Sequence, residues 1–199
     1  MIDCHSYLRS LLTKRQNSEI LQFAEENLIP IITPEVENFL RVFLQLTKPK
    51  RILEIGTAIG YSALHMHEIS NAEIVTIEKK SELADIAKTF TAGKPIEILT
   101  GNAVELLPAL TGEFCISFLD GAKGQYLKML PDLMRLSKVI VCDNVLYKGK
   151  VASGEVEPRG QRTIVNNLRK FLDEISHNPA LDTTILPLGD GISISIVKA

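Results

Sequence analysis

The architecture of this chain is signalled most plainly between residues 53 and 62, where the sequence is Leu53-Glu54-Ile55-Gly56-Thr57-Ala58-Ile59-Gly60-Tyr61-Ser62. An apolar run that starts at Arg51 leads into two glycines, and a helical pattern of apolar residues begins at Tyr61. Gly56 and Gly60 let the backbone turn sharply and pass close to a ligand before that helix begins. A strand, a glycine-containing turn and a helix in this order predict the first unit of an α/β sheet.

Short apolar runs alternate with helical segments along the rest of the chain. The runs predicted as strands are 51–55, 73–77, 96–99, 115–119 and 139–142. The segments predicted as helices are 61–68, 81–90, 103–110, 125–136 and about 161–175. Strands that are apolar on both faces and separated by helices predict a parallel sheet covered on both sides. Residues 183–186 and 192–197 flank the turn Gly189-Asp190-Gly191 and predict a hairpin at an antiparallel edge.

The length of 199 residues predicts one domain, with a helical N-terminal extension over 1–48 and a Rossmann-like core over 49–199. Thr33 followed by Pro34 predicts a helix start, because threonine caps a helix and proline is tolerated in its first turn. A composition that is 45% apolar and 23% charged excludes a largely disordered chain. The net charge of −2 argues against a protein that binds nucleic acid through overall basicity, but a local basic patch stays possible.

Cysteine usage and hydrophobic runs suggest a location. No window approaches 18 uninterrupted apolar residues, and MIDCHSYLRS lacks a basic segment followed by an apolar run, so we expect no membrane span and no secretory signal. Cys4, Cys115 and Cys142 are far apart and form no CxxC or Cys/His cluster, which argues against zinc and disulfides. The last two lie in apolar strands and are expected to be buried free thiols. Reduced cysteines predict a cytoplasmic protein.

An acidic residue after the second predicted strand points to a nucleoside ligand. Glu78 lies 22 residues beyond Gly56, where a carboxylate can accept hydrogen bonds from both hydroxyls of a ribose. The dinucleotide fingerprint GxGxxG needs glycine at positions held by Ala58 and Tyr61, which argues against a nicotinamide-dependent oxidoreductase. Ribose binding without a diphosphate cradle indicates S-adenosylmethionine.

Three oxygen-bearing side chains follow the fourth and fifth predicted strands. Asp120 comes after one strand, and Asp143 and Asn144 come after the next. Any one of them alone more often caps a turn or a helix. Because the carboxyl ends of neighbouring parallel strands meet at one edge, we expect these three to surround one point. Hard oxygen donors without thiolate or imidazole suit Mg²⁺ or another divalent cation.

Three segments carry a family resemblance. The sequences LEIGTAIGYSALHM, FLDGAKGQY and CDNVLYKG resemble motifs of the metal-dependent O-methyltransferases of the catechol and caffeoyl-CoA O-methyltransferase family. The resemblance runs in matching order from about Thr33 to the C-terminus. It implies a class I methyltransferase fold, that is, a mostly parallel seven-stranded sheet with helices on both faces and a C-terminal antiparallel hairpin. It also implies a homodimer, which is usual among bacterial members.

The resemblance implies roles for particular residues. Gly56 and Ser62 would neighbour the methionine part of S-adenosylmethionine, Glu54 would support that pocket, and Glu78 would bind the ribose. The turn after the third strand would border the adenine and consists of Gly101, Asn102 and Ala103.

On the reaction side, the resemblance makes Asp120, Asp143 and Asn144 the metal ligands. Asp120 is expected to border the cofactor and to take part in catalysis as well. Lys123 matches the general base that removes the proton from the acceptor hydroxyl.

The sequence says less about the methyl acceptor than about the cofactor and the cation. Residues 124–126 and 144–149 resemble a bacterial branch that methylates 5-hydroxyuridine at the wobble position of tRNA, giving 5-methoxyuridine. Its hydroxyl lies beside a carbonyl and can chelate a cation as a catechol does. Two groups of basic residues could contact the anticodon region; they are Lys148, Lys150, Arg159, Arg162, Arg169 and Lys170, and Arg9, Lys14 and Arg15. Basic residues in loops and helices also form ordinary solvated faces.

Two other functions compete with an RNA methyltransferase. One is a small-molecule O-methyltransferase that acts on catechol-like phenols. The other is a non-catalytic nucleoside-binding module, against which the predicted metal ligands and Lys123 argue, because binding alone needs neither.

Overall fold

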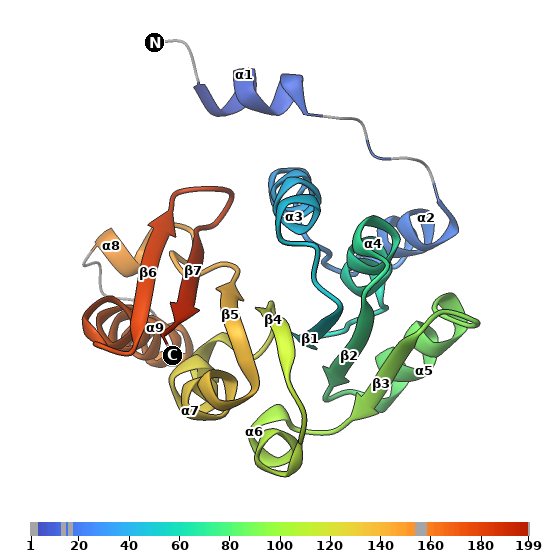
Figure 1. Ribbon diagram of the computed structural model, residues 1–199. Coiled ribbons are helices and arrows are strands. Elements are labelled where there is room, and N and C mark those ends of the chain that lie inside the picture. The colour runs from blue at the N-terminus through green and yellow to red at the C-terminus, as the bar shows by residue number, and fades with distance from the viewer. Residues whose placement is uncertain (1–3, 13–14, 16–17, 154–158, 199) are drawn as a thin grey trace.

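The computed structural model describes residues 4–12, 15, 18–153 and 159–198, with the side chains of 4–6, 159 and 160 left aside. Seven strands form one sheet in the order β3-β2-β1-β4-β5-β7-β6 (Figure 1). Strands β1 to β5 pair in parallel, whereas β7 is antiparallel to β5 and β6. The predicted Rossmann-like fold with a C-terminal hairpin is therefore confirmed. The strands are Arg51–Ile55 (β1), Glu73–Glu78 (β2), Ile96–Thr100 (β3), Phe114–Leu119 (β4), Ser137–Cys142 (β5), Leu181–Leu186 (β6) and Ile192–Val197 (β7).

The helices follow the predicted alternation. They are Cys4–Leu11 (α1), Glu19–Glu26 (α2), Pro34–Thr47 (α3), Tyr61–Ser70 (α4), Ser81–Phe90 (α5), Ala103–Leu106 (α6), Tyr126–Leu136 (α7), Lys150–Ser153 (α8) and Arg159–His177 (α9), with 3-10 turns at Leu107–Ala109 (η1) and Lys123–Gln125 (η2). The single helix predicted over 103–110 was wrong in one respect, since it splits into α6 and η1. Pro108 supplies no amide hydrogen for an α-helical bond, and the chain tightens into a 3-10 turn there.

Two layers of helices cover the sheet (Figure 1). On one face, α7 and α9 bury side chains such as Leu133 and Phe171 against strand residues that include Leu53. On the other face, α3 and α4 bury Leu40 and Met66 against a second set of strand residues. Alternate residues of β1 point to opposite faces, so a strand that is apolar on both sides fills both cores.

The start of α3 is built as the sequence predicts. Thr33 Oγ1 accepts a hydrogen bond from the backbone N–H of Val36, and Pro34 occupies the first turn. Farther toward the N-terminus, α1 lies beyond α3 and away from the sheet (Figure 1). Among the described residues, no helix combines the length and the apolar character that crossing a membrane requires.

Cys115 and Cys142 are free thiols, as predicted, but they differ in burial. Cys142 is buried, whereas Cys115 is only half-buried, so the expectation of burial was wrong for it. Its sulfur lies 3.4 Å from the backbone nitrogen of Lys50.

The strand order determines where a ligand can bind. From β1 the sheet continues to β2 and β3 on one side and to β4 and β5 on the other. The connections therefore run in opposite directions from β1 and β4, and a crevice opens at the carboxyl ends of these central strands.

Candidate active site

Two adjoining cavities of about 460 and 440 Å³ lie at this crevice. They share part of their walls, including Gly56, Glu78 and Lys123. The first is also lined by Ser62, Asp120, Asp143 and Asn144, and the second by Gly101, Asn102 and Ala103. The structure therefore brings every predicted site residue except Glu54 to the wall of one continuous cleft.

Close backbone contact shapes the floor of the cleft. Gly56 has a φ of +106°, which side chains rarely adopt, and a Cβ there would lie 2.9 Å from the backbone nitrogen of Gly121. A Cβ on Gly121 would in turn lie 2.9 Å from the Cα of Gly56. The ends of β1 and β4 consequently touch backbone to backbone, and a side chain at either glycine would push them apart.

Glu78 is held in a fixed orientation. Its Oε2 accepts a hydrogen bond from the backbone N–H of Ala58, and its Oε1 accepts one from that of Lys80, both at 2.9 Å. Each carboxylate oxygen has a second lone pair, so both can still accept hydrogen bonds from a ribose diol.

Glu54 lies beneath the cleft and does not line it. Its side chain is fully buried, and its two oxygens accept hydrogen bonds of 2.5 Å from Ser62 and Thr76. Thr57 continues this network through a 2.6 Å bond to Thr76. Burial raises the pKa of Glu54 to about 7, although both hydroxyl donors oppose the shift. Glu54 can therefore influence a ligand only through Ser62 and the strand ends that it supports.

Asp120 and Asp143 lie close enough for their charges to interact. Asp143 is 1% exposed, and its pKa is raised to about 7 by burial and then by the charge of Asp120. Burial also raises the pKa of Asp120, while the charge of Lys123 opposes that shift. A buried carboxylate and a partly buried one that repel each other form a place where a divalent cation is stabilising.

Asn144 completes the predicted donor set. It has a φ of +56°, and its backbone N–H donates a 2.6 Å hydrogen bond to Oδ1 of Asp143. Within the described ranges, no three His, Cys, Asp or Glu side chains gather as a metal-binding group. The candidate set instead joins two carboxylates to one amide, and these three residues could hold a hard cation that keeps water on its other positions.

Lys123 lies between the two cavities in the turn η2. Its Nζ is 3.3 Å from Oδ1 of Asp120, and its side chain is 25% exposed. Ala122 before it has a left-handed φ of +53°. Asn167 of α9 donates a 2.8 Å hydrogen bond to the carbonyl of Gly124 and ties this turn to the helix layer. The amine is therefore held beside Asp120 and at the wall of the cleft, where it can exchange a proton with a bound acceptor.

One wall of the cleft was not predicted from the sequence. The loop 29–33 lines the first cavity together with the strand ends. Arg15 donates a hydrogen bond to the carbonyl of Ile32 and pairs with Glu37 of α3 at 2.6 Å. The hydroxyl of Tyr61 donates to the same carboxylate at 2.9 Å. Only Pro30 and the break in the helical pattern hinted at this loop, because its position depends on contacts between distant segments.

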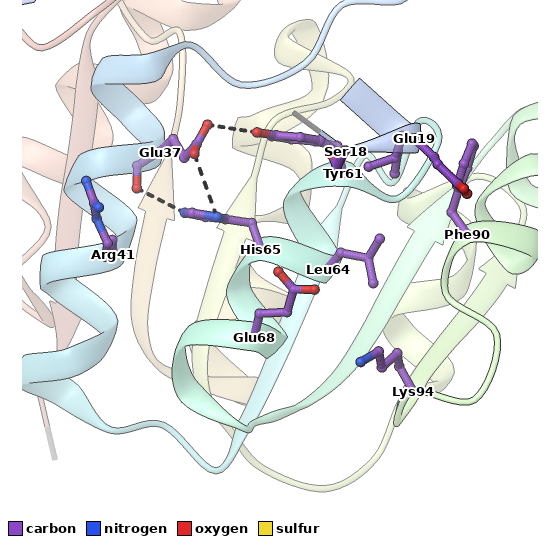
Figure 2. A pocket seen from close by; sticks show the side chains of 11 residues that line it. Ser18, Glu19, Glu37, Arg41, Tyr61, Leu64, His65, Glu68, Phe90 and Lys94 are labelled. Atoms are coloured by element: carbon purple, nitrogen blue, oxygen red, sulfur yellow. Dashed lines mark hydrogen bonds and ion pairs between the residues drawn. The ribbon is translucent and has the colours of Figure 1, made fainter. Parts of the chain in front are cut away.

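A larger pocket of about 560 Å³ lies elsewhere, along α3 and α4 (Figure 2). Figure 2 shows Glu37 bonded to Tyr61 and beside His65, with Arg41 and Lys94 at opposite ends. Its carboxylates are dispersed, and it contains none of the predicted site residues. We therefore place the chemistry at the strand ends and not in this larger pocket.

Some of the predicted basic residues have partners within the protein. Arg169 donates hydrogen bonds to the carbonyls of Val151 and Lys150, and Arg9 pairs with Glu35 at 2.6 Å, as Arg15 does with Glu37. Lys148, Arg162 and Lys170 are exposed. Lys14 and the side chain of Arg159 lie outside the described residues.

A Rossmann-like sheet with a glycine turn, an acid at the end of β2 and a cleft at the central strand ends is the arrangement of a class I methyltransferase. The O-methyltransferase family model matches residues 6–198. The chain belongs to this O-methyltransferase family.

Individual proteins that the chain resembles are also O-methyltransferases. A catechol O-methyltransferase of Niastella koreensis is 32% identical over 185 residues, which cover 84% of this chain and 82% of that one. A caffeoyl-CoA O-methyltransferase of Mesembryanthemum crystallinum is 32% identical over 176 residues, covering 78% and 68%. The solved O-methyltransferase of Bacillus cereus in complex with SAH aligns with a TM-score of 0.83 and 26% identity, covering 97% of this chain and 96% of that one.

Proposed function

We propose that this protein transfers the methyl group of S-adenosylmethionine to a hydroxyl that has an oxygen neighbour, with the help of Mg²⁺ or another divalent cation. The observation that carries the proposal is the meeting of Asp120, Asp143 and Asn144 with Gly56, Ser62 and Glu78 in one cavity. A binding module for nucleosides would need only the second trio.

Cofactor binding is supported by the walls of the cleft. Gly56 allows close approach of a ligand to the backbone, and Glu78 offers two fixed acceptors for ribose hydroxyls. Gly101, Asn102 and Ala103 would border the adenine. The Bacillus cereus relative in complex with SAH gives independent support, since SAH is what remains of the donor after methyl transfer.

The chemistry requires an oxygen nucleophile aligned with a methyl group. When bound, the donor supplies an electrophilic sulfonium methyl, and the cation supplies positive charge that favours ionisation of the acceptor hydroxyl. Asp120, Asp143 and Asn144 offer the oxygen ligands, and the cleft walls orient donor and acceptor. Lys123 acts as the base that takes the proton of the hydroxyl at Nζ. Asp120 contacts Lys123 and fixes that amine beside the acceptor.

The acceptor that we propose is 5-hydroxyuridine at the wobble position of tRNA. Its hydroxyl and C4 carbonyl form the required oxygen pair. Lys148, Arg162 and Lys170 are exposed and available for phosphate contacts. Arg9, Arg15 and Arg169 already contact other groups of the protein. The proposed RNA contact therefore relies on Lys148, Arg162 and Lys170.

A small phenolic acceptor is the second candidate. The printed names of two relatives, a catechol and a caffeoyl-CoA O-methyltransferase, favour it. Catechols present the same vicinal oxygen pair, so the cleft alone does not separate the two acceptors.

The test is methyl transfer at fixed Mg²⁺ and S-adenosylmethionine with the acceptor exchanged. Hypomodified tRNA that carries 5-hydroxyuridine should become labelled and yield 5-methoxyuridine in nucleoside mass spectrometry. Labelling of catechols with no labelling of tRNA would overturn the tRNA acceptor and favour a small phenol. Loss of activity with EDTA and its return with Mg²⁺ tests the cation separately.

Charge reversal provides a matched comparison for RNA contact. Lys148→Glu and Arg162→Glu should each lower kcat/KM for tRNA by about threefold or more in low salt and leave that for catechol unchanged. Lys138→Glu is the control, since Lys138 is exposed at the amino-terminal part of β5, opposite the strand ends that line the cleft.

We also propose a homodimer. The apolar face formed by α1 and α3 exposes 59% of Leu8, 53% of Val42 and 77% of Leu46 and borders a groove of about 660 Å³. Contiguous exposed apolar residues of this kind typically contact another protein surface. Light scattering should give twice the chain mass for the wild type and a lower mass for Leu46→Glu.

A further inference from the structure

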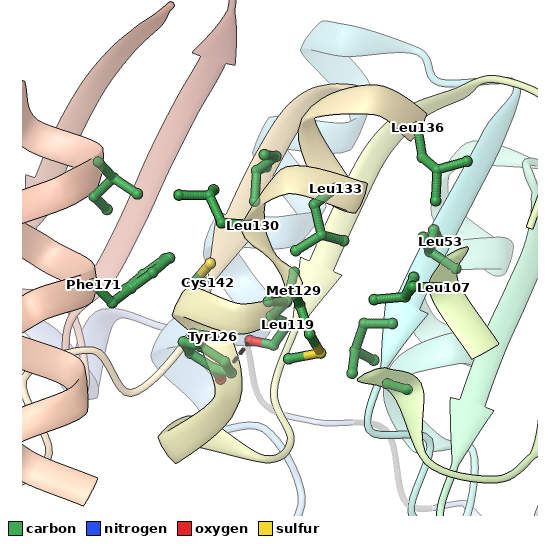
Figure 3. Close-up of a cluster of buried hydrophobic side chains, with 14 of the residues drawn as sticks. Leu53, Leu107, Leu119, Tyr126, Met129, Leu130, Leu133, Leu136, Cys142 and Phe171 are labelled. Atoms are coloured by element: carbon green, nitrogen blue, oxygen red, sulfur yellow. Dashed lines mark hydrogen bonds between the residues drawn. The ribbon is translucent and has the colours of Figure 1, made fainter. Parts of the chain in front are cut away.

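Tyr126 is the first residue of α7 and the largest fully buried side chain of the described part of the chain. Its ring packs edge to face against Phe171 of α9, with ring centroids 5.5 Å apart. Figure 3 shows it between Phe171 and the end of β4 at Leu119. A phenylalanine would fill the same space, so packing explains the ring but leaves the hydroxyl unexplained.

The hydroxyl contacts two strand ends at once. It donates to the carbonyl of Leu119 at 3.1 Å and to that of Asp143 at 3.2 Å, sharing one proton between two acceptors. Leu119 is the last residue of β4 and directly precedes Asp120, whereas Asp143 directly follows β5. One buried group therefore joins the two backbone segments that carry the carboxylates of the cleft.

The backbone hydrogen bonds at these strand ends connect Asp120 and Asp143 to different strands. The N–H of Asp143 donates to the carbonyl of Leu119 at 2.8 Å, which is the last rung between β4 and β5. The N–H of Asp120 instead donates to Ile55 of β1 at 3.0 Å. The backbone of Asp120 is thus hydrogen-bonded to the end of β1 and that of Asp143 to the end of β4. The Tyr126 hydroxyl adds a bond from outside the sheet to both segments.

We propose that Tyr126 is a positioning residue, whose hydroxyl holds the ends of β4 and β5 at the spacing that a divalent cation between Asp120 and Asp143 requires. This inference rests on the cation site of the proposed function. Groups that orient metal ligands through hydrogen bonds typically change metal affinity by about 10- to 100-fold when they are removed. The hydroxyl acts through two carbonyls and touches neither substrate nor cation.

The test is Mn²⁺ binding to the full chain, followed by electron paramagnetic resonance of the unbound ion. Tyr126→Phe keeps the ring that packs on Phe171 and removes only the hydroxyl. We expect its Kd for Mn²⁺ to rise about tenfold, with the Kd for S-adenosylhomocysteine within twofold of wild type. Turnover of the variant should partly recover as Mn²⁺ is raised, because the lost affinity is restored by concentration.

Ser137→Ala is the matched control. It removes the hydrogen bond between the hydroxyls of Ser117 and Ser137, which joins the same two strands away from the cleft. We expect this variant to lose stability but to bind Mn²⁺ as wild type does. Equal Mn²⁺ affinity in wild type and Tyr126→Phe would overturn the inference alone, and so would equal weakening in both variants. A wild type that binds no Mn²⁺ would overturn the cation site itself, and this inference with it.

Discussion

Each half of the cleft is built on a pair of acidic residues, and the two pairs have different partners, although one of the four, Glu54, lies beneath the cleft and not on its wall. In the cofactor half, at the ends of β1 and β2, Glu54 accepts bonds from Ser62 and Thr76, and Glu78 accepts two backbone N–H groups. In the cation half, at the ends of β4 and β5, Asp120 and Asp143 face each other's charge. Donors of the protein engage both oxygens of each acid in the first half. In the second half, Asn144 and Lys123 each contact one aspartate oxygen, and the two aspartates still repel each other, so an ion from solution can balance their charge.

This difference predicts that a substitution in one half affects a different ligand from a substitution in the other half. The cofactor half should govern affinity for the donor, and the cation half should govern turnover. Four substitutions test the separation, in descending order of expected effect on activity.

Asp143→Asn should have the largest effect. It removes one carboxylate from the cation half, and several kcal/mol of lost charge stabilisation correspond to a decrease in turnover of about a thousandfold. Binding of S-adenosylhomocysteine, measured by calorimetry, should change less than threefold. A variant that turns over normally would show that the cation half is not catalytic.

Lys123→Ala should follow, because it removes the proposed base and leaves both acid pairs in place. We expect kcat to fall by about a hundredfold, the lower range for a general base, with Mn²⁺ affinity equal to or higher than that of wild type. The measurement is single-turnover methyl transfer. Unchanged kcat would remove Lys123 from the reaction and leave the cation site intact.

Glu78→Gln should act on the other half. An amide replaces one acceptor with a donor, so at least one ribose hydrogen bond and one backbone bond are lost. The affinity for S-adenosylhomocysteine should fall about tenfold, equivalent to about 1.4 kcal/mol, while Mn²⁺ affinity stays within twofold. Equal losses for both ligands would mean that the halves are not separable.

Glu54→Gln should have the smallest effect on activity but a distinct effect on stability. The pKa of Glu54 is raised to about 7 in the folded protein, so the folded state binds its proton more tightly than the unfolded state. The Glu54 contribution to stability is therefore fully present below about pH 4.5 and is lost as pH rises to about 7, by about 3 kcal/mol. Glu54→Gln should flatten this slope in denaturant titrations.

The stability that the cation half contributes should also fall as the pH rises. Because the pKa of Asp143 is also raised to about 7, stability without a divalent cation should fall over the same interval. Mg²⁺ should reverse that part of the loss and leave the Glu54 part unchanged, since it binds only to the deprotonated aspartates. A slope that Glu54→Gln does not alter would contradict the assignment of its pKa.

Much of the fold followed from local patterns. The strand 51–55, the helix 81–90 and the strand 192–197 were predicted at the residues where they occur, because uninterrupted apolar runs and helical spacing are local properties. The break at Pro108 was missed because the helical spacing of apolar residues continues through it, whereas the α-helical pattern of backbone hydrogen bonds does not.

The candidate site was predictable where strand ends supplied it. Asp120, Asp143 and Gly56 follow strands directly, so the topology alone brought them together. The Tyr126 hydroxyl and the loop 29–33 could not be predicted in the same way, because their contacts join segments far apart in sequence. The division into 1–48 and 49–199 and the roles of the site residues stay predictions.

The proposed reaction depends on a divalent cation that binds between the ends of β4 and β5, beside the donor. The most direct test is anomalous diffraction from crystals grown with Mn²⁺ and S-adenosylhomocysteine. We predict one strong peak within coordination distance of side-chain oxygens of Asp120, Asp143 and Asn144, in the cavity that also contains the sulfur of the cofactor product. Well-ordered cofactor product with no manganese peak among these three residues would rule out the proposed cation site.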